Sequence, residues 1–324
     1  MSDAIVIIKS LREQCEDYIA FKKASGIKAQ KEAQVLRRFV LLAEGWEPGV
    51  TTISKKSAER WETLSPEETP TNQQHRKGIV RRFANHLMTR GVEAFVYPKY
   101  RHIPTSFAPY IFTNDELARF FTACDNTLTP NLIRSDVAAL IFRMLYACGM
   151  RLSEAIKLKV RDVDFEQGII RINDAKFDKE RLLPVHDTLL IRMKHYAKKV
   201  LSFVGNDSPF FPNAQKNHYS PNGIYSMFRE RLWAAGISHG GKGNGPRAHD
   251  LRHTFAVHCL RRAVYNGDDL SVTLKYLSVY LGHTNVLSTQ AYLRLTADMY
   301  PDIVYKMETD FDVLPDLEAL NETD

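Results

Sequence analysis

An aperiodic stretch with three prolines, residues 96–113, divides this chain into two parts that must fold differently. Proline has no amide proton and a fixed φ angle, so three of them so close together exclude a continuous helix or a central strand. Before the stretch, apolar residues recur with a helical period; after it, helical segments surround two segments of alternating polar and apolar residues. We therefore expect a helical domain over residues 1–97, a linker over 98–112 and a larger domain over 113–324.

The N-terminal part carries the pattern of four helices. Residues 5–46 predict two amphipathic helices with a break near Ser25 and Gly26, and further helices are expected over about residues 54–64 and 72–90. The fourth helix has basic residues on and beside one face, while its apolar residues turn inward. Such a basic face is a candidate contact for a phosphate backbone, and its members are Arg76, Lys77, Arg81 and Arg82.

The C-terminal part combines helices with one small sheet. Residues 164–173 and 175–185 alternate polar and apolar side chains around turn signals, which is typical of antiparallel strands. The predicted fold class is therefore mainly α with a small antiparallel β-sheet. Helices are expected over about residues 113–124, 133–148, 152–158, 188–203, 221–235, 249–265 and 270–281, with a short one around Tyr292 and a last one from about Pro301.

The positive charge of the chain is unevenly distributed. The formal net charge is +6 and the isoelectric point is near 9.0. Residues 308–324 contain seven acidic residues and no Lys or Arg; without them 31 acidic residues face 44 basic ones, a net charge of +13. This excess of positive charge in residues 1–307 favours a polyanionic partner such as DNA, although a merely solvated basic surface would have the same composition.

The chain lacks the sequence signals of membrane, secreted, zinc-binding and nucleotide-binding proteins. Its apolar runs, such as residues 137–142, are far shorter than the ~20 residues needed to span a bilayer. The four cysteines lie far apart, the histidines show no zinc-type spacing, and there is no P-loop. We expect a cytoplasmic protein, associated with the nucleoid when bound to DNA, that uses no metal and no cofactor.

Four separated segments hold side chains that could carry chemistry. Taken singly, each has an ordinary structural explanation; Arg151 and Glu154, for example, could form an exposed helix ion pair. Their order along the chain is more informative, because it combines cations, imidazoles and a tyrosine in one fixed series. The series is Arg151, Glu154, Lys176, His249, Arg252, His283 and Tyr292.

In this order and spacing the series resembles the tyrosine recombinase family, which includes phage integrases, Xer-type recombinases and Cre-like enzymes. The flanking motifs also match: Gly-x-Arg-x-Ser-Glu, Lys-x-x-Lys-Glu-Arg, His-Asp-Leu-Arg-His-Thr-Phe and Leu-Gly-His. The resemblance covers about residues 110–300, whereas the first hundred residues match only in general character, as a helical core-binding domain. The segment between Arg252 and His283 is longer than in compact Xer-type members, which favours a mobile element over a housekeeping role.

The resemblance implies a reaction in which Tyr292 attacks a DNA phosphate and forms a 3′-phosphotyrosyl intermediate. Two guanidiniums, Arg151 and Arg252, would hold the non-bridging oxygens, with His283 as a third donor. His249 would assist proton transfer from the tyrosine, and Lys176 would protonate the leaving 5′ oxygen. Glu154 would orient Arg151 and hydrogen-bond toward His249, while Lys179 and Arg181, beside the hairpin lysine, would contact DNA. Neither ATP nor a metal is required.

The implied partner is double-stranded DNA with inverted half-sites, on which four protomers would gather across two sites. The acidic, apolar-dotted tail, residues 308–324, either docks on a neighbouring protomer or is a solvated extension. The predicted function is site-specific recombination or integration for a mobile element. Alternatives are Xer-like resolution of chromosomes or plasmids, a type IB topoisomerase, and a DNA-binding protein without catalysis.

Overall fold

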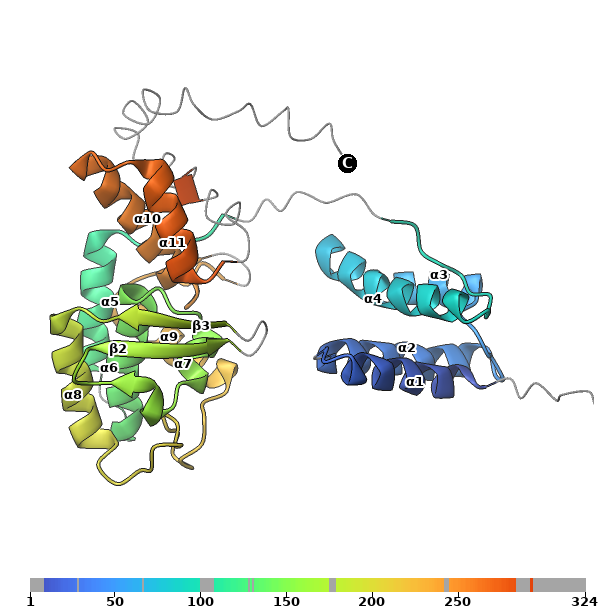
Figure 1. The fold of residues 1–324 in the computed structure, drawn as a ribbon, viewed down its shortest axis with the longest axis horizontal. Coiled ribbons are helices and arrows are strands. Elements are labelled where there is room, and N and C mark those ends of the chain that lie inside the picture. The colour runs from blue at the N-terminus through green and yellow to red at the C-terminus, as the bar shows by residue number, and fades with distance from the viewer. Residues whose placement is uncertain are drawn as a thin grey trace, which may run out of the picture. The chain divides into compact units, whose positions relative to one another are not determined.

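The computed structural model describes residues 9–27, 29–65, 67–99, 108–127, 129, 131–174, 179–241, 245–283 and 292–293. The chain divides into two compact units between Ser106 and Phe107, inside the predicted linker (Figure 1). The helix expected from Pro301 and the acidic tail lie outside the described residues. Each unit is described by itself below.

The N-terminal unit is helical in its described part, as the periodicity predicts. Its helices are α1 (Leu11–Ala24), α2 (Gln30–Trp46), α3 (Lys55–Thr63) and α4 (Pro70–Thr89). Ser10, Ser54 and Thr69 cap three of them, each accepting a hydrogen bond from a backbone N–H of the first turn. Their apolar faces enclose one core, which includes Phe39, Trp61 and Phe83.

The C-terminal unit contains a three-stranded antiparallel sheet of order β1-β2-β3, which confirms the predicted fold class. The strands are β1 (Val163–Asp164), β2 (Ile169–Asp174) and β3 (Lys179–Pro184), and in their register Ile172 faces Arg181. A short 3₁₀ helix, Val160–Asp162, precedes β1. The helices are α5 (Asn114–Asn126), α6 (Leu132–Ala147), α7 (Leu152–Lys157), α8 (Asp187–Val200), α9 (Pro221–Ala234), α10 (Asp250–Asn266) and α11 (Leu270–Leu281).

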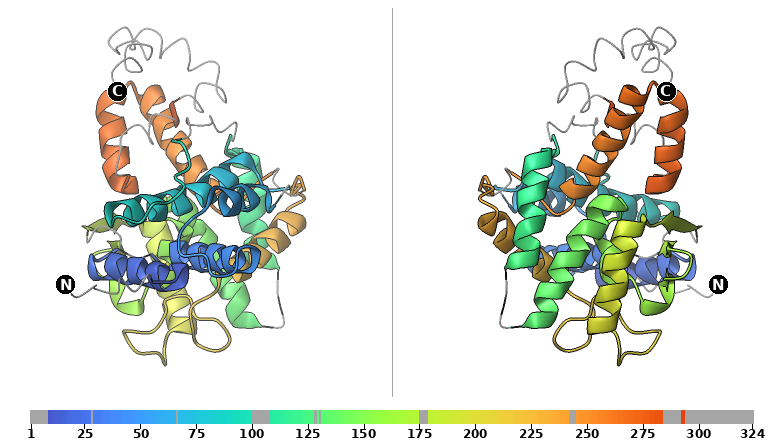
Figure 2. Two further views of the ribbon diagram at one scale, coloured as in Figure 1. Left: turned by 90° about the vertical axis from the view of Figure 1, so that its right-hand side faces the viewer. Right: turned by 90° about the vertical axis from the view of Figure 1, so that its left-hand side faces the viewer.

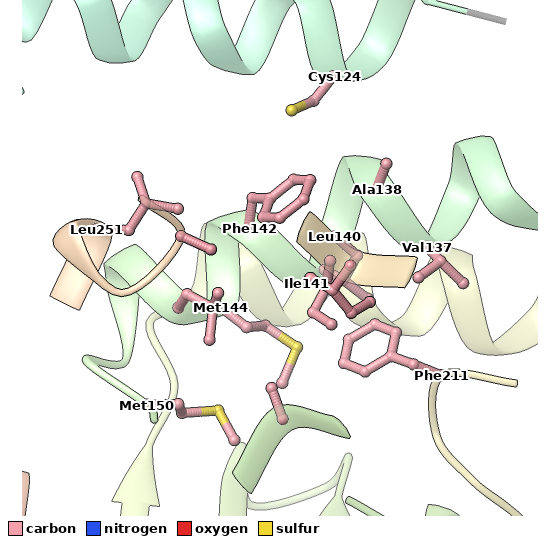
Figure 3. Packing of buried hydrophobic residues seen from close by; sticks show 14 of the residues in the cluster. Cys124, Val137, Ala138, Leu140, Ile141, Phe142, Met144, Met150, Phe211 and Leu251 are labelled. Carbon is pink, nitrogen blue, oxygen red and sulfur yellow. The ribbon is translucent and has the colours of Figure 1, made fainter. Parts of the chain in front are cut away.

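Helix α6 forms the centre of this unit. It lies beside α5 and α8, as the right-hand view of Figure 2 shows. Its residues are apolar around most of its circumference, and Ile141, Phe142 and Met144 are fully buried. Figure 3 shows these side chains among residues of other segments, including Leu251 at the start of α10. Burying each such side chain stabilises the fold by roughly 1.5–3 kcal/mol, so α6 is a rigid support for what is attached to its end.

Helices α10 and α11 pack against each other at one end of the unit (Figure 1). The long segment noted between Arg252 and His283 is accounted for by this pair and its turn. Gly267 ends α10 in the left-handed conformation, and Asp269 caps α11 through its side chain. Helix α11 has the predicted bounds, whereas α8 ends at Val200 and not at residue 203. Within the described residues, every helix is too short or too polar to cross a membrane.

Candidate active site

Helix α10 begins with a turn that places three polar side chains together. His249 is its N-cap residue, and Arg252 and His253 follow three and four positions later, on one face of the helix. Asp250 fixes this start, because its buried carboxylate accepts a hydrogen bond of 2.7 Å from the backbone N–H of Arg247. The sequence His-Asp-Leu-Arg-His therefore presents two imidazoles and one guanidinium side by side.

The guanidinium of Arg252 is buried where two helix ends meet. Its side chain is 2% exposed, and it donates hydrogen bonds of 2.6 Å to the carbonyls of Gly149 and Leu281. These carbonyls lie at the C-terminal ends of α6 and α11, which carry partial negative charge. Burial, and next the nearby charge of Arg151, lower the pKa of Arg252 to about 10, so it remains a cation at neutral pH.

Two glycines allow these helix ends to approach the arginines. Gly149 (φ +56°) and Gly282 (φ +66°) adopt the left-handed conformation that glycine tolerates best. A Cβ at Gly149 would lie 2.6 Å from the ring of Phe255, and a Cβ at Gly282 would lie 2.9 Å from the guanidinium of Arg181. A side chain at Gly149 would therefore displace Phe255, and one at Gly282 would displace Arg181.

Arg151 is held by the carbonyl of Gly282, and its side chain is partly exposed to solvent. One of its Nη atoms donates to the carbonyl of Gly282 at 2.5 Å, and the other donates to Glu154 at 2.9 Å. Its side chain is 31% exposed, in contrast to that of Arg252. Because Leu281 and Gly282 are adjacent, their carbonyls hold two guanidiniums close together, one accessible and one buried. Such paired forked donors match the oxygens of a phosphate.

Glu154 lies between two arginines. It accepts hydrogen bonds from Arg151 and from both Nη atoms of Arg181, the latter at 3.0 and 2.7 Å. Burial opposes its ionisation, but the hydrogen bonds and charge of Arg181, with those of Arg151, lower its pKa below 4.5. The expected orientation of Arg151 by Glu154 is present in this geometry. The expected hydrogen bond toward His249 is not, because these two arginines occupy the carboxylate.

Tyr292 is packed into this cluster with its hydroxyl group inward. Its side chain is 4% exposed, and its Oη lies 2.9 Å from Nδ1 of His253. Its ring is stacked with that of His283 at a centroid distance of 6.1 Å. Burial raises the pKa of Tyr292, whereas the charge and a hydrogen bond of Arg252, and the charge of Arg151, act to lower it. The phenol is therefore neutral at rest beside the groups that could stabilise its anion.

Three imidazoles of the site are neutral at pH 7. Burial, reinforced by the positive charges of Arg252 and its neighbours, lowers the pKa of His249 and of His283 to about 4. Burial, with His249 and Arg252 as the next causes, lowers the pKa of His253 to about 3. Neutral imidazoles donate one hydrogen bond and accept another, so these rings add polar contacts without adding charge.

His253 belongs to the site although the order of motifs in the sequence did not predict it. It appeared there only within a flanking motif, although its spacing from His249 already placed the two side chains on one helix face. The position of Tyr292 along the chain gave no means of deciding which of the two rings the hydroxyl group would meet. That choice depends on how the segment of Tyr292 packs against α10.

The predicted residues of the hairpin are placed only in part. Lys176 and the side chain of Lys179 lie outside the described residues. Arg181 is 13% exposed and paired with Glu154, so its placement favours support of the site over the predicted contact with DNA. Among the residues that the structure describes, no group of three or more histidine, cysteine or acidic side chains is arranged to hold a metal ion.

The predicted basic face of α4 is divided by the structure. Arg76 and Lys77 are buried and form ion pairs with Glu68 and Glu62, and Arg76 also donates to the carbonyl of Trp61. This placement counts against their predicted contact with DNA. Positions 76 and 77 lie on the buried face of α4, beside its apolar residues, so the helix turns both side chains toward the core. Arg82 is 52% exposed, and Arg81 is intermediate in exposure.

Comparison with known proteins gives consistent matches. The model of the phage integrase family matches residues 111–299. A putative integrase/recombinase of Sinorhizobium fredii, y4rE, is 30% identical over 89% of this chain and 93% of its own length. The tyrosine recombinase XerA of Pyrococcus furiosus is 32% identical over 49% of this chain and 50% of its own.

A solved structure has a similar fold. The XerH site-specific recombinase bound to a palindromic difH substrate covers 86% of this chain and 79% of its own, with a TM-score of 0.63 and 18% identity. At this level of identity the similarity concerns the fold, and it extends over both units of the chain.

Proposed function

The chain belongs to the phage integrase family and is a tyrosine recombinase, and on this premise we propose that it cleaves and rejoins DNA at specific sites through a 3′-phosphotyrosyl intermediate on Tyr292. The observation that carries the proposal is the burial of the Tyr292 hydroxyl group beside Arg252 and two imidazoles. A tyrosine that only fills the core does not require cations and imidazoles beside its hydroxyl group, whereas a nucleophilic tyrosine requires them for activation.

The two guanidiniums supply the electrostatic stabilisation in this proposal. Attack on phosphorus passes through a five-coordinate state in which the non-bridging oxygens gain negative charge. Arg151 and Arg252 are fixed by carbonyls at one helix end, so the two guanidiniums are oriented before DNA binds. His283 follows the same helix end and adds a third donor. Pre-oriented donors of this kind stabilise the transition state without a cost of reorganisation at the moment of reaction.

The remaining residues manage protons and orientation. Lys176 is assigned as the general acid that protonates the leaving 5′ oxygen, and His249 is the predicted aid to proton transfer from the tyrosine. Glu154 positions Arg151 and is itself held by Arg181. Cleavage breaks the P–O5′ bond as the P–Oη bond forms, and a 5′ hydroxyl group reverses the step. The phosphodiester bond energy is thereby conserved, so that rejoining needs no ATP.

The proposed DNA partner is a duplex site made of two inverted half-sites. Four protomers would bring two such duplex sites together. The N-terminal unit would grip the duplex as a core-binding domain, with Arg81 and Arg82 as candidate phosphate contacts. The XerH structure named above is a complex with a palindromic DNA substrate, which supports a site of this symmetry. The Sinorhizobium relative is named a putative integrase/recombinase, which supports an integrase role; that this role serves a mobile element is part of the proposal.

The proposal is tested with a nicked suicide substrate, whose sequence is taken from the DNA sites to which the protein binds. Footprinting on the DNA that flanks its own locus would locate the half-sites. The wild-type protein should then form a covalent adduct that survives a denaturing gel, whereas Tyr292→Phe should bind equally well and form none. An adduct with the Phe variant would exclude Tyr292, and Tyr280 and Tyr300 would be tested next.

A second experiment separates recombination from simple relaxation of DNA. Truncation after Met307 removes the acidic tail, which we expect to link protomers. Binding to one half-site should be nearly unchanged, while cooperative binding to the second half-site and strand exchange between two plasmids should fall sharply. Full recombination by the truncated protein would make the tail a solvated extension. Relaxation of supercoils by the intact monomer, with no joining of duplexes, would favour a type IB topoisomerase.

A further inference from the structure

The hydroxyl group of Tyr292 meets a different imidazole from the one that the family resemblance implies. Its Oη lies 2.9 Å from Nδ1 of His253, within hydrogen-bonding distance, and the two rings have a centroid distance of 5.6 Å. The ring of His249 packs edge-on against that of His253, with a centroid distance of 4.8 Å. A general base must be within hydrogen-bond reach of the proton it removes, and His253 meets that requirement directly.

We propose that His253, through Nδ1, is the group that accepts the phenolic proton of Tyr292 during attack on DNA. The inference rests on the proposed function of Tyr292 as the nucleophile. In the cleavage step the Oη–H bond breaks and the proton moves to Nδ1, the Oη–P bond forms and the P–O5′ bond breaks. The 5′ oxygen receives its proton from the separate general acid. In rejoining, protonated His253 returns its proton to the departing tyrosine.

The surroundings of His253 link this proton transfer to the presence of a phosphate. Arg252 lies on its own helix, Arg247 precedes that helix, and His249 and His283 contribute further positive potential when charged. Together with burial, these groups keep His253 neutral and weakly basic in the absence of DNA. A phosphate held by Arg151 and Arg252 brings a negative charge that offsets the arginines and favours a protonated His253. The base is therefore strengthened by the substrate on which it acts.

The role of His249 becomes that of a positioning residue in this arrangement. It holds the edge of the His253 ring and thereby fixes the direction of Nδ1 toward Tyr292. Replacement of His249 should slow the reaction while leaving its dependence on pH as in the wild type, because the accepting atom is still present.

The test compares His253→Asn with His249→Asn in single-turnover formation of the adduct between pH 6 and 9. Asparagine can place an oxygen near the position of Nδ1, so it accepts the hydrogen bond but cannot take the proton. We expect His253→Asn to form the adduct at least roughly 10²-fold more slowly than the wild type, at unchanged DNA affinity. Its rate should rise tenfold per pH unit, since hydroxide must then remove the proton. His253→Gln should show the same pH dependence and checks the result in a second side chain.

A substrate with sulfur at the bridging 5′ position locates the defect on the tyrosine side. Sulfur leaves without being protonated, so this substrate should restore cleavage by Lys176→Ala but not by His253→Asn. The proposal is overturned if His253→Asn and His253→Gln keep the wild-type pH profile, or if sulfur restores their rates. Failure of the wild-type protein to form any adduct would instead contradict the proposed function.

Discussion

Buried basic side chains occur in both units of the molecule, but their hydrogen-bond partners differ. In the N-terminal unit Arg76 and Lys77 each face a carboxylate, Glu68 and Glu62. In the C-terminal unit Arg252 is held by two backbone carbonyls. A carboxylate cancels the charge of its partner, whereas a carbonyl at a helix end orients it and cancels only a fraction. The first arrangement serves stability; the second retains positive charge for an anionic ligand.

The same distinction explains the position of Glu154. Its single carboxylate lies near three guanidiniums, so the described cluster keeps an excess of positive charge. These are the side chains of Arg151, Arg181 and Arg252. Its carboxylate holds Arg151 by one Nη, and the other Nη is directed to the carbonyl of Gly282. The site thus combines one carboxylate, which sets the geometry, with carbonyls that leave the charge available.

The largest effect is expected from Arg252→Lys. The charge is kept but the fork that spans Gly149 and Leu281 is lost, so formation of the covalent adduct should fall by about 10²–10³-fold. Arg76→Lys is the matched control, since its fork serves Glu68 in the other unit. It should lower the free energy of unfolding and leave the adduct rate of the folded protein unchanged. Equal losses of rate in both variants would remove the distinction between the clusters.

Glu154→Gln should lower the free energy of unfolding by about 1.5–3 kcal/mol, because two arginines lose a charged acceptor. The pKa of Glu154 is lowered in the folded state, so its stabilisation is full above pH 4.5 and is lost as the pH falls through that lower pKa. The acid slope of stability below pH 4.5 should therefore be shallower in the variant. Chemical denaturation across this pH range measures both quantities.

Glu230→Gln provides the comparison for that experiment. Glu230 also pairs with an arginine, Arg134, but its side chain is 41% exposed. Pairs of this exposure contribute only about 0.2–1 kcal/mol. A loss in Glu230→Gln as large as that in Glu154→Gln would mean that the cluster is no more than an ordinary surface network.

Gly282→Ala should cost about 1–2 kcal/mol of stability, the strain of a left-handed alanine, and should also slow the adduct reaction. Gly267→Ala is matched in backbone conformation, at φ +75°, but a Cβ there meets nothing within 4 Å. In thermal unfolding both variants should lose stability, Gly282→Ala at least as much as Gly267→Ala because its Cβ also meets Arg181, and only Gly282→Ala should lose activity. Normal activity in Gly282→Ala would show that the carbonyl at this helix end need not be held in place.

The smallest effect is expected from chelation. If Arg151 and Arg252 stabilise the phosphate, excess EDTA should leave the rate of adduct formation unchanged. A loss of cleavage that magnesium restores would contradict the assignment of this charge to the arginines.

Sequence periodicity predicted the described helices and the strands β2 and β3, but it missed the two-residue strand β1 and the short 3₁₀ helix before it, and it was insufficient for several contacts. Helix α11 was predicted with its observed bounds, and in the structure Asp269 caps its start and Gly282 its end. The burial of Arg76 and Lys77 was not predicted, because their acidic partners lie in a segment whose packing against α4 is a tertiary property. The contact of Tyr292 with His253, 39 positions earlier in the chain, was missed for the same reason.

The most direct test of the account is to identify the amino acid and the DNA end in the covalent adduct. Protease digestion of the adduct formed on a suicide substrate, followed by mass spectrometry, should give one peptide that carries a nucleotide 3′-phosphate on Tyr292. In Arg252→Lys the same peptide should appear at a strongly reduced yield. Attachment to another residue such as Tyr280, or attachment through a 5′-phosphate, would contradict the proposed chemistry at this site.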